Sequence, residues 1–300
     1  MNKDNKQLYF AYGSNLNSQD LASFAKDSRF KKEIYLKKYS SDYVLPDYKL
    51  VFTKYSKKRE GGVLDILPAK GSCVFGVVFE IDEGEKLIID AKEGKGTDYE
   101  TKEVTLVNYR GEELNCFTYV VKEEVKDTSG FVMPNEKYFK LVLKGLSEHN
   151  LSNTNLIEAS KNQYKNLDSI FVYGTLMQGE EREHIMQKYS PLSIRAAQVN
   201  GNLYNMGSYP ALKNLYSNRD NNLVQGEVWK FSGEIVKALL VELDEIEEFF
   251  GYNNKDNLYI RVPTKVDLYK QENCFAWTYV YVQSITEGQE IKTNDWRKRI

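Results

Sequence analysis

The sequence predicts an α+β protein made of two tandem copies of one domain. Three kinds of segment occur twice in the same order: an apolar run ending in Tyr-Gly-Ser or Tyr-Gly-Thr, a β-rich block around a glycine, and a helical stretch ending in apolar-Asp-x-x-Glu. Ordered repetition of this kind indicates a duplicated domain. The chain length of 300 residues agrees, because it is about twice the commonest domain size.

The first repeated segment is a predicted strand that ends in a glycine turn, at residues 8–16 and again at residues 169–176. A helix is expected to follow in each copy. Gly13 and Gly174 allow the backbone to approach a ligand closely, and unpaired amides near a helix start favour a carboxylate or a developing oxyanion. A turn that only ends a strand is the alternative for a single Tyr-Gly-Ser. Its duplication with the same downstream blocks favours a ligand-binding loop.

The second repeated segment is a β-rich block with a central glycine, and a helical stretch follows it in each copy. The blocks cover residues 74–81 and 224–231, and the helical stretches end at residues 89–94 and 243–247. Each copy then runs to a tyrosine that opens a further strand, and on to an aromatic, β-branched run typical of a central strand. These strands are predicted over residues 99–107 and 116–121 in the first copy, and 259–266 and 274–282 in the second.

Glu93 and Glu247 close the two helical stretches and are the candidate acid-base residues. A carboxylate that follows an apolar helix and faces aromatic strands can be partly desolvated, which raises its pKa toward the working pH and suits it to carry a proton. Asp90 and Asp244 lie three residues earlier, on the same helical face, and are expected to brace rather than react. Because both glutamates lie among other acidic residues, a solvated surface charge is the alternative.

The two copies differ outside the shared segments. The first copy alone has a predicted helix over residues 135–149, where apolar residues recur at helical spacing. The polar residues 152–166 lack apolar periodicity and are predicted to form the linker, which gives domains of residues 1–152 and 166–300. The charged residues 295–299 are expected to be solvated surface.

Composition excludes several classes of function. The 41 Lys and Arg against 43 Asp and Glu give a net charge of -2, so no global field draws the chain to nucleic acid or to an anionic membrane. The 3 cysteines are far apart and indicate reduced thiols, and the 2 histidines lack a zinc or triad motif, so no metal or cofactor is expected. With no long apolar run or signal-like start, a cytoplasmic protein is expected.

Together these blocks resemble the gamma-glutamylcyclotransferase family over nearly the whole chain. The first half matches the gamma-glutamylcyclotransferase pattern at residues 12–16, 52–62, 74–77, 90–94 and 134–138. The second half looks more like the gamma-glutamylamine cyclotransferase branch at residues 173–176, 201–212, 226–228 and 243–247. The resemblance implies that each domain is a small mixed β-barrel with flanking helices, and that the partner is a small-molecule gamma-glutamyl substrate.

In this family the free α-amine of the substrate attacks the γ-carbonyl and closes a five-membered ring, which releases 5-oxoproline and an amine or amino acid. The resemblance implies that Glu93 and Glu247 move the proton and that the Tyr-Gly loops bind the substrate, with no cofactor and no metal. Three further tyrosines are expected beside the bound substrate. The predicted binding residues are therefore Tyr12, Gly13, Ser14, Asn15, Leu16, Tyr99, Tyr138, Tyr173, Gly174, Thr175, Leu176 and Tyr259.

Two alternatives stay open. In the second copy, extra residues separate Glu247 from Gly251 where the family usually has Glu-Gly-Tyr, which bears on whether that copy turns over. The alternative function is a tandem binding module that keeps a pocket for a gamma-glutamyl or related amino-acid ligand, with turnover lost in one or both domains. The sequence identifies neither the leaving amine nor the oligomeric state.

Overall fold

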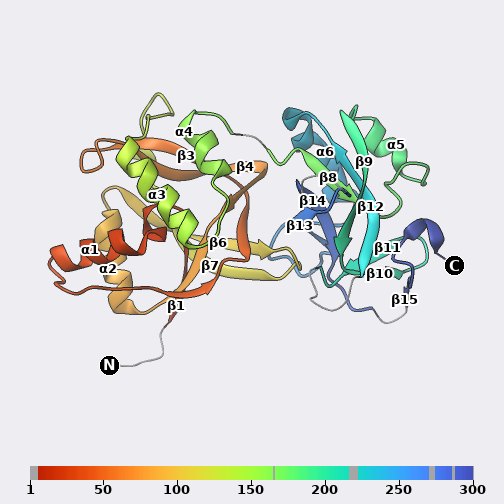
Figure 1. Cartoon of the computed structure of the whole chain (residues 1–300), viewed down its shortest axis with the longest axis horizontal. Helices are drawn as coiled ribbons and strands as arrows, with labels where there is room; N and C mark the ends of the chain where they lie inside the picture. Colours follow the sequence, from red (N-terminus) through yellow and green to blue (C-terminus); the bar gives the residue numbers. More distant parts are fainter. Residues whose placement is uncertain (1–5, 165, 216–221, 270–273, 286–287, 300) are drawn as a thin grey trace. The chain divides into compact units, whose positions relative to one another are not determined.

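The protein consists of two sheet-rich units in tandem (Figure 1). The computed structural model describes residues 6–164, 166–215, 222–269, 274–285 and 288–299. The chain divides into a first unit, Met1–Leu106 with Leu114–Tyr164, and a second unit, Val107–Glu113 with Lys165–Ile300. Each unit combines a mixed sheet with helices. The α+β class and the tandem architecture predicted from the sequence are therefore confirmed.

The first unit is built on a seven-stranded sheet in the order β2-β5-β1-β7-β6-β3-β4. The short strand β1 lies inside this sheet, antiparallel to β5 and parallel to β7. The strands are β1 (Gln7–Ala11), β2 (Lys37–Ser40), β3 (Tyr43–Ser56), β4 (Gly61–Phe75), β5 (Val77–Ile81), β6 (Tyr99–Asn108) and β7 (Glu113–Val121). The helices are α1 (Ser18–Asp27), α2 (Glu83–Glu93), α3 (Glu136–Glu148) and α4 (Thr154–Ser160), with short 3₁₀ turns η1 (Ser14–Leu16) and η2 (Glu123–Val125).

Local sequence fixes both ends of α2, the helix that carries Glu93. Asp82 and Glu85 form a capping box at its start, in which each side chain accepts the other residue's backbone N–H. Gly94 ends the helix in the left-handed conformation, at φ 63°, which glycine adopts without a steric penalty. Glu93 is therefore the last residue of the helix, at a defined point.

One part of the predicted linker is wrong, because residues 152–166 contain the helix α4. Its side chains Leu156 and Ala159 are buried in the core of the first unit. Over seven residues these two positions are too few to produce a periodic pattern in the sequence. The burial of its apolar side chains, rather than an intrinsic pattern, stabilises this short helix.

The second unit has a five-stranded sheet in the order β13-β14-β8-β12-β9 and a three-stranded sheet in the order β11-β10-β15. The strands are β8 (Ser169–Val172), β9 (Ser193–Asn200), β10 (Asn202–Asn205), β11 (Pro210–Lys213), β12 (Leu223–Lys230), β13 (Tyr259–Val266), β14 (Cys274–Tyr281) and β15 (Gln289–Glu290). The helices are α5 (Glu183–Gln187) and α6 (Gly233–Ile246), with a 3₁₀ turn η3 (Trp296–Lys298).

The seven-stranded and five-stranded sheets are mixed, the three-stranded sheet is antiparallel, and all three are open. Within the described residues each sheet keeps two edge strands, so no ladder closes into a complete barrel. The five-stranded sheet comes nearest to closure, because one isolated bridge joins its edge strand β9 to the residue that directly follows its other edge strand, β13. There Gln198 and Asp267 exchange backbone hydrogen bonds of 2.9 and 3.0 Å.

The two units repeat one strand arrangement around β1 and β8. Each of these strands lies antiparallel to one neighbour, β5 or β12, and parallel to another, β7 or β14. Gly76 and Gly226 occupy equivalent crowded positions: a Cβ would lie 2.4 Å from the carbonyl oxygen of Ala11 in the first unit and of Val172 in the second. The central glycine of the repeated β-rich block is therefore required by close backbone packing.

The prediction of solvated surface for residues 295–299 is correct for Arg297, Lys298 and Arg299, which are exposed, and wrong for Trp296. Trp296 is only 1% exposed. Arg297 donates to the Glu227 carboxylate at 2.9 Å and to the Gln178 carbonyl at 2.8 Å, and Arg299 donates to Glu180 at 3.1 Å. These contacts join the end of the chain to residues far away in sequence, which local charge cannot reveal.

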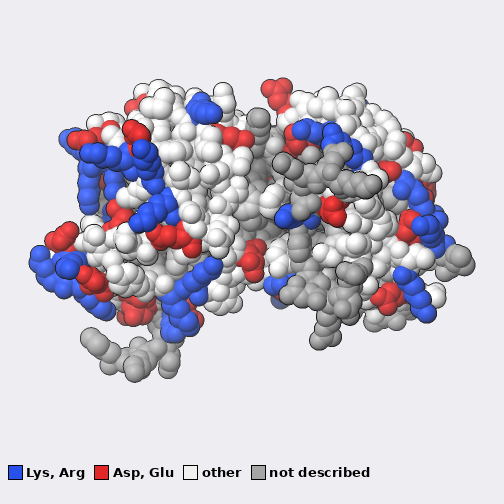
Figure 2. All heavy atoms as spheres, in the orientation of Figure 1, with Lys and Arg blue, Asp and Glu red and all other residues white. Residues whose placement is uncertain are grey.

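The surface carries charges of both signs. On the face that Figure 2 shows, basic and acidic side chains are interspersed, in keeping with the net charge of -2. Among the described residues, no helix has both the length and the apolar character needed to cross a bilayer.

Candidate active sites

Glu93 and the glycine loop of the first unit line one small cavity of about 30 Å³. The loop begins where β1 ends, and Gly13, Ser14 and Asn15 all face the cavity. The Asn15 side-chain amide donates to Glu93 Oε1 at 2.7 Å and to the Tyr9 hydroxyl at 2.8 Å. The long-range pairing of loop and helix end that the sequence predicted is therefore present.

Burial and the neighbouring polar groups shift the pKa of Glu93 in opposite directions. Burial raises the pKa of Glu93, while Lys92, Asn15 and Arg59 favour its charged form. Lys92 donates to Asn15 Oδ1 at 2.8 Å and pairs with Asp20 at 2.7 Å. Arg59 also donates two hydrogen bonds to the Asp20 carboxylate, of 3.0 and 2.8 Å. The two cations nearest the glutamate are thus already paired with an acid.

A second cavity of about 90 Å³ lies beside the first and shares Ser14, Glu93, Tyr99 and Tyr138 with it. The Tyr99 hydroxyl donates to the Leu64 carbonyl at 3.0 Å, and the Tyr138 hydroxyl accepts from the Leu64 amide at 3.4 Å. Burial raises the pKa of both tyrosines. These hydroxyls are therefore neutral groups in the wall of the site.

Two predicted binding residues of the first unit have other surroundings. Leu16 lines neither cavity, and its side chain is buried in the core. Tyr12 does line the inner cavity, but its hydroxyl donates to the Tyr119 carbonyl at 2.6 Å. Tyr12 thus holds β1 against β7, with its ring in the cavity wall.

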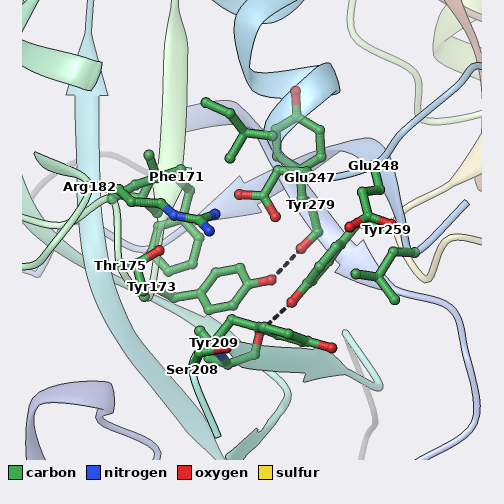
Figure 3. Close-up of a pocket in the computed structure, with 16 residues that line it drawn as sticks. Phe171, Tyr173, Thr175, Arg182, Ser208, Tyr209, Glu247, Glu248, Tyr259 and Tyr279 are labelled. Carbon is green, nitrogen blue, oxygen red and sulfur yellow. Dashed lines mark hydrogen bonds between the residues drawn. The ribbon is translucent and has the colours of Figure 1, made fainter. Parts of the chain in front are cut away.

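The second unit has a larger cavity, of about 210 Å³, between the glycine loop after β8 and the end of α6 (Figure 3). Glu247 follows the last helical residue and faces this cavity. Burial raises the pKa of Glu247 to about 7, although the positive charge of Arg182 lowers this pKa. All five predicted binding residues line the cavity with it: Tyr173, Gly174, Thr175, Leu176 and Tyr259.

Hydrogen bonds of the first site recur in the second. Tyr173 donates to the Tyr279 carbonyl at 2.6 Å, as Tyr12 does to Tyr119. Tyr259 donates to the Pro210 carbonyl at 2.6 Å, which matches the bond from Tyr99 to Leu64. The duplication therefore preserves the frame of the site as well as the order of its strands.

The aspartates before each glutamate brace the frame, as predicted. The Tyr119 hydroxyl donates to Asp90 at 2.5 Å, and the Tyr279 hydroxyl donates to Asp244 at 2.6 Å. Each bond ties a sheet strand to the helix that ends in the candidate glutamate. The aspartates thus act on the position of that helix, with their carboxylates occupied.

Several cavity residues were not predicted. Tyr119 and Tyr279 carry a signal that could have identified them, because Thr-Tyr-Val occurs in both copies at residues 118–120 and 278–280. Other missed residues have no repeated signal. Tyr9 and Lys92 lie in repeated segments at positions where the two copies differ in residue type, and the others lie outside those segments. These residues are Tyr9, Leu64, Arg59, Lys92, Arg182, Ser208, Tyr209 and Glu248. In the portion of the chain that the structure describes, no group of three His, Cys, Asp or Glu side chains gathers as a metal site.

Comparison with known proteins identifies one family for both halves and relatives of the chain. A family model described as gamma-glutamyl cyclotransferase, AIG2-like, matches residues 9–140 and 170–298. The gamma-L-glutamyl-butirosin B gamma-glutamyl cyclotransferase of Niallia circulans is 34% identical over 133 residues, which cover 44% of this chain and 77% of that protein. The gamma-glutamylcyclotransferase of Bos taurus is 28% identical over 181 residues, which cover 59% of this chain and 91% of that protein.

A solved structure of a gamma-glutamyl cyclotransferase is also similar, at 25% identity and a TM-score of 0.43, covering 51% of this chain and 86% of its own. The family model matches well over half of the chain, in two separate segments that correspond to the two copies. The chain therefore belongs to the gamma-glutamyl cyclotransferase, AIG2-like family and carries two tandem domains of it.

Proposed function

We propose that the two tandem domains, the first of which includes α4, each convert a gamma-glutamyl amide to 5-oxoproline and a free amine or amino acid. The observation that carries this proposal is the same in each unit: one glutamate lies in the same cavity as one glycine loop. The substrate brings its own nucleophile, the α-amine. The protein therefore has to orient the chain, stabilise an oxyanion and move one proton.

In the second domain, Glu247 accepts the proton that the substrate's α-ammonium group loses. The amine nitrogen then attacks the γ-carbonyl carbon, and the loop amides after Gly174 stabilise the resulting oxyanion. The ring nitrogen of the tetrahedral intermediate then loses its second proton to solvent. When the intermediate collapses, the bond to the leaving nitrogen breaks, that nitrogen takes the proton from Glu247, and the released amine is protonated in water. A pKa of about 7 suits both transfers, because the carboxyl exists in both protonation states near neutral pH.

In the first domain, Glu93 has the same role, with the loop amides after Gly13 facing the oxyanion. The Asn15 amide that donates to Glu93 fixes the orientation of the carboxylate. It leaves the second carboxylate oxygen to receive the proton of the substrate amine.

A half-active protein is the second candidate. The first cavity is small, about 30 Å³ against about 210 Å³ in the second unit. In addition, the Glu93 carboxylate already accepts a hydrogen bond from Asn15. Both observations favour turnover in the second domain, with the first domain serving to bind a ligand.

The proposal is tested on the full chain with a panel of gamma-glutamyl amides, followed by mass spectrometry of released 5-oxoproline. We expect the double variant Glu93→Gln with Glu247→Gln to lose roughly a hundredfold or more in rate, because glutamine keeps the shape of glutamate but cannot accept and release a proton. The matched controls are Glu83→Gln and Glu245→Gln, at exposed positions on the same two helices.

The outcomes separate the candidates. If the double variant released 5-oxoproline at the parental rate, the assignment of the two glutamates would be wrong. If Glu247→Gln alone removed all turnover and Glu93→Gln removed none, the half-active protein would be the correct description. Ligand-dependent stabilisation without any product would identify a binding module.

A further inference from the structure

The second cavity contains a cation that the proposed proton transfer does not use. Arg182 lines the cavity together with Glu247, at the end of the loop that begins at Gly174. Figure 3 shows its guanidinium group pointing toward the Glu247 carboxylate. The two charges interact, but no ion pair joins Arg182 to an acid within the ranges that the structure describes. The half-buried guanidinium is therefore available to a ligand.

The backbone holds Arg182 in place. Its N–H donates to the Thr175 carbonyl at 2.8 Å, which closes the loop on itself. Within the loop, the Gly179 N–H donates to the Glu183 carboxylate at 2.8 Å, and the Gln178 N–H donates to Glu227 at 2.9 Å. A loop tied at several points loses little backbone entropy when its side chain binds a ligand.

We propose that Arg182 binds the α-carboxylate of the substrate's gamma-glutamyl group, an inference that rests on the proposed function. The α-amine and the α-carboxylate are bonded to the same carbon, so a substrate whose amine reaches Glu247 places its carboxylate close by. Arg182 is the one cationic side chain among the described residues that line this cavity.

Charge complementarity supports this assignment. The gamma-glutamyl head group has one ammonium and one carboxylate, and the cavity offers the Glu247 carboxylate and the Arg182 guanidinium in matching positions. Burying a carboxylate without a partner is strongly unfavourable. A guanidinium group provides two parallel N–H donors that fit a carboxylate, which an ammonium group does not.

The first site differs in this respect. Its nearest cations, Arg59 and Lys92, both bind Asp20, at 2.8 and 2.7 Å. Binding of the substrate α-carboxylate by an arginine without an acidic partner is thus a property of the second domain. In a Glu247→Gln background, where only the first domain turns over, Arg182→Met is expected to leave the remaining rate unchanged.

The test uses the full chain with Glu93→Gln, so that turnover reports the second domain. Arg182→Met, Arg182→Lys and the control Arg195→Met are compared on gamma-glutamylglycine and on 4-aminobutanoylglycine, which lacks the α-carboxylate and cyclises to 2-pyrrolidinone. We expect Arg182→Met to lower kcat/KM for gamma-glutamylglycine by roughly ten- to a hundredfold, the usual effect of losing a charged hydrogen-bond partner. The same variant should change kcat/KM for 4-aminobutanoylglycine less than threefold, and lysine should rescue only in part.

Equal losses on both substrates would overturn the proposal, because Arg182 would then act on Glu247 or on the loop. The proposal would also be overturned if gamma-glutamylmethylamide, whose leaving amine has no carboxylate, were insensitive to Arg182→Met. That result would assign the arginine to the leaving group.

Failure of the proposed function is recognised separately, as an absence of product from the parent chain with every gamma-glutamyl compound. In that event calorimetry with 5-oxoproline and 2-pyrrolidinone still tests the arginine. We expect Arg182→Met to weaken binding of 5-oxoproline alone. Unchanged binding of 5-oxoproline would refute the assignment.

Discussion

Replacing Glu247 by glutamine is expected to remove turnover in the second domain and to stabilise that domain at neutral pH. The folded protein holds this carboxyl at a pKa of about 7, against 4.5 for an ordinary glutamate. Between these values the folded domain keeps a proton that the unfolded chain has lost. Rising pH therefore weakens folding through this group, and the loss is complete only above about pH 7. Glutamine has no such dependence.

The expected magnitude follows from the displaced pKa. Between pH 5 and pH 8, the free energy of unfolding of Glu247→Gln should rise by about 2.5 kcal/mol relative to that of the parent. The difference between the two proteins is the useful quantity, because contributions of all other titrating groups cancel. Glu247 would then be a residue whose raised pKa serves catalysis but lowers the free energy of unfolding at neutral pH.

Tryptophan fluorescence during urea unfolding measures this effect in the second domain specifically. The 3 tryptophans of the chain are Trp229, Trp277 and Trp296, all in the second half and all buried. Glu245→Gln, at an exposed position of α6, is the control and should change stability equally at both pH values. A Glu247→Gln difference that stayed constant within about 0.5 kcal/mol from pH 5 to pH 8 would refute the link between burial and this carboxyl.

Three further predictions follow from the contacts described above. In Glu93→Gln, kcat/KM should rise about tenfold per pH unit below about pH 7 and level off above it, as Glu247 ionises; a flat profile would exclude Glu247 as the base. Glu227→Ala, which leaves the buried Trp229 indole N–H without its acceptor, should lower the unfolding free energy of the second domain by about 3 kcal/mol by tryptophan fluorescence; a loss below about 1 kcal/mol would mean that water replaces the carboxylate. Leu156→Ala should cost the first domain about 3 kcal/mol, measured by near-ultraviolet circular dichroism of its tyrosines; no loss would show that α4 adds nothing to the core.

The sequence predicted the loops and glutamates of the two sites but not the direction of every side chain. The glycine loops and the glutamates Glu93 and Glu247 were predictable, because each lies in a motif that occurs twice in the same order. Leu16 was predicted only by its place in such a motif, and its side chain is in the core. A motif gives the position of the backbone loop, but the direction of each side chain depends on what packs around it.

The sequence by itself determined the α+β class, the duplication, and the pairing of one glycine loop with one acidic helix end in each half. These features depend on local patterns: strand alternation, the left-handed Gly94 after α2, and repeated order along the chain. Only the tertiary structure decided that α4 belongs to a core, that Trp296 is buried, and that Arg182 faces Glu247. Each of these is a contact between segments far apart in sequence, and its free energy comes from burial and charge pairing that no local window contains.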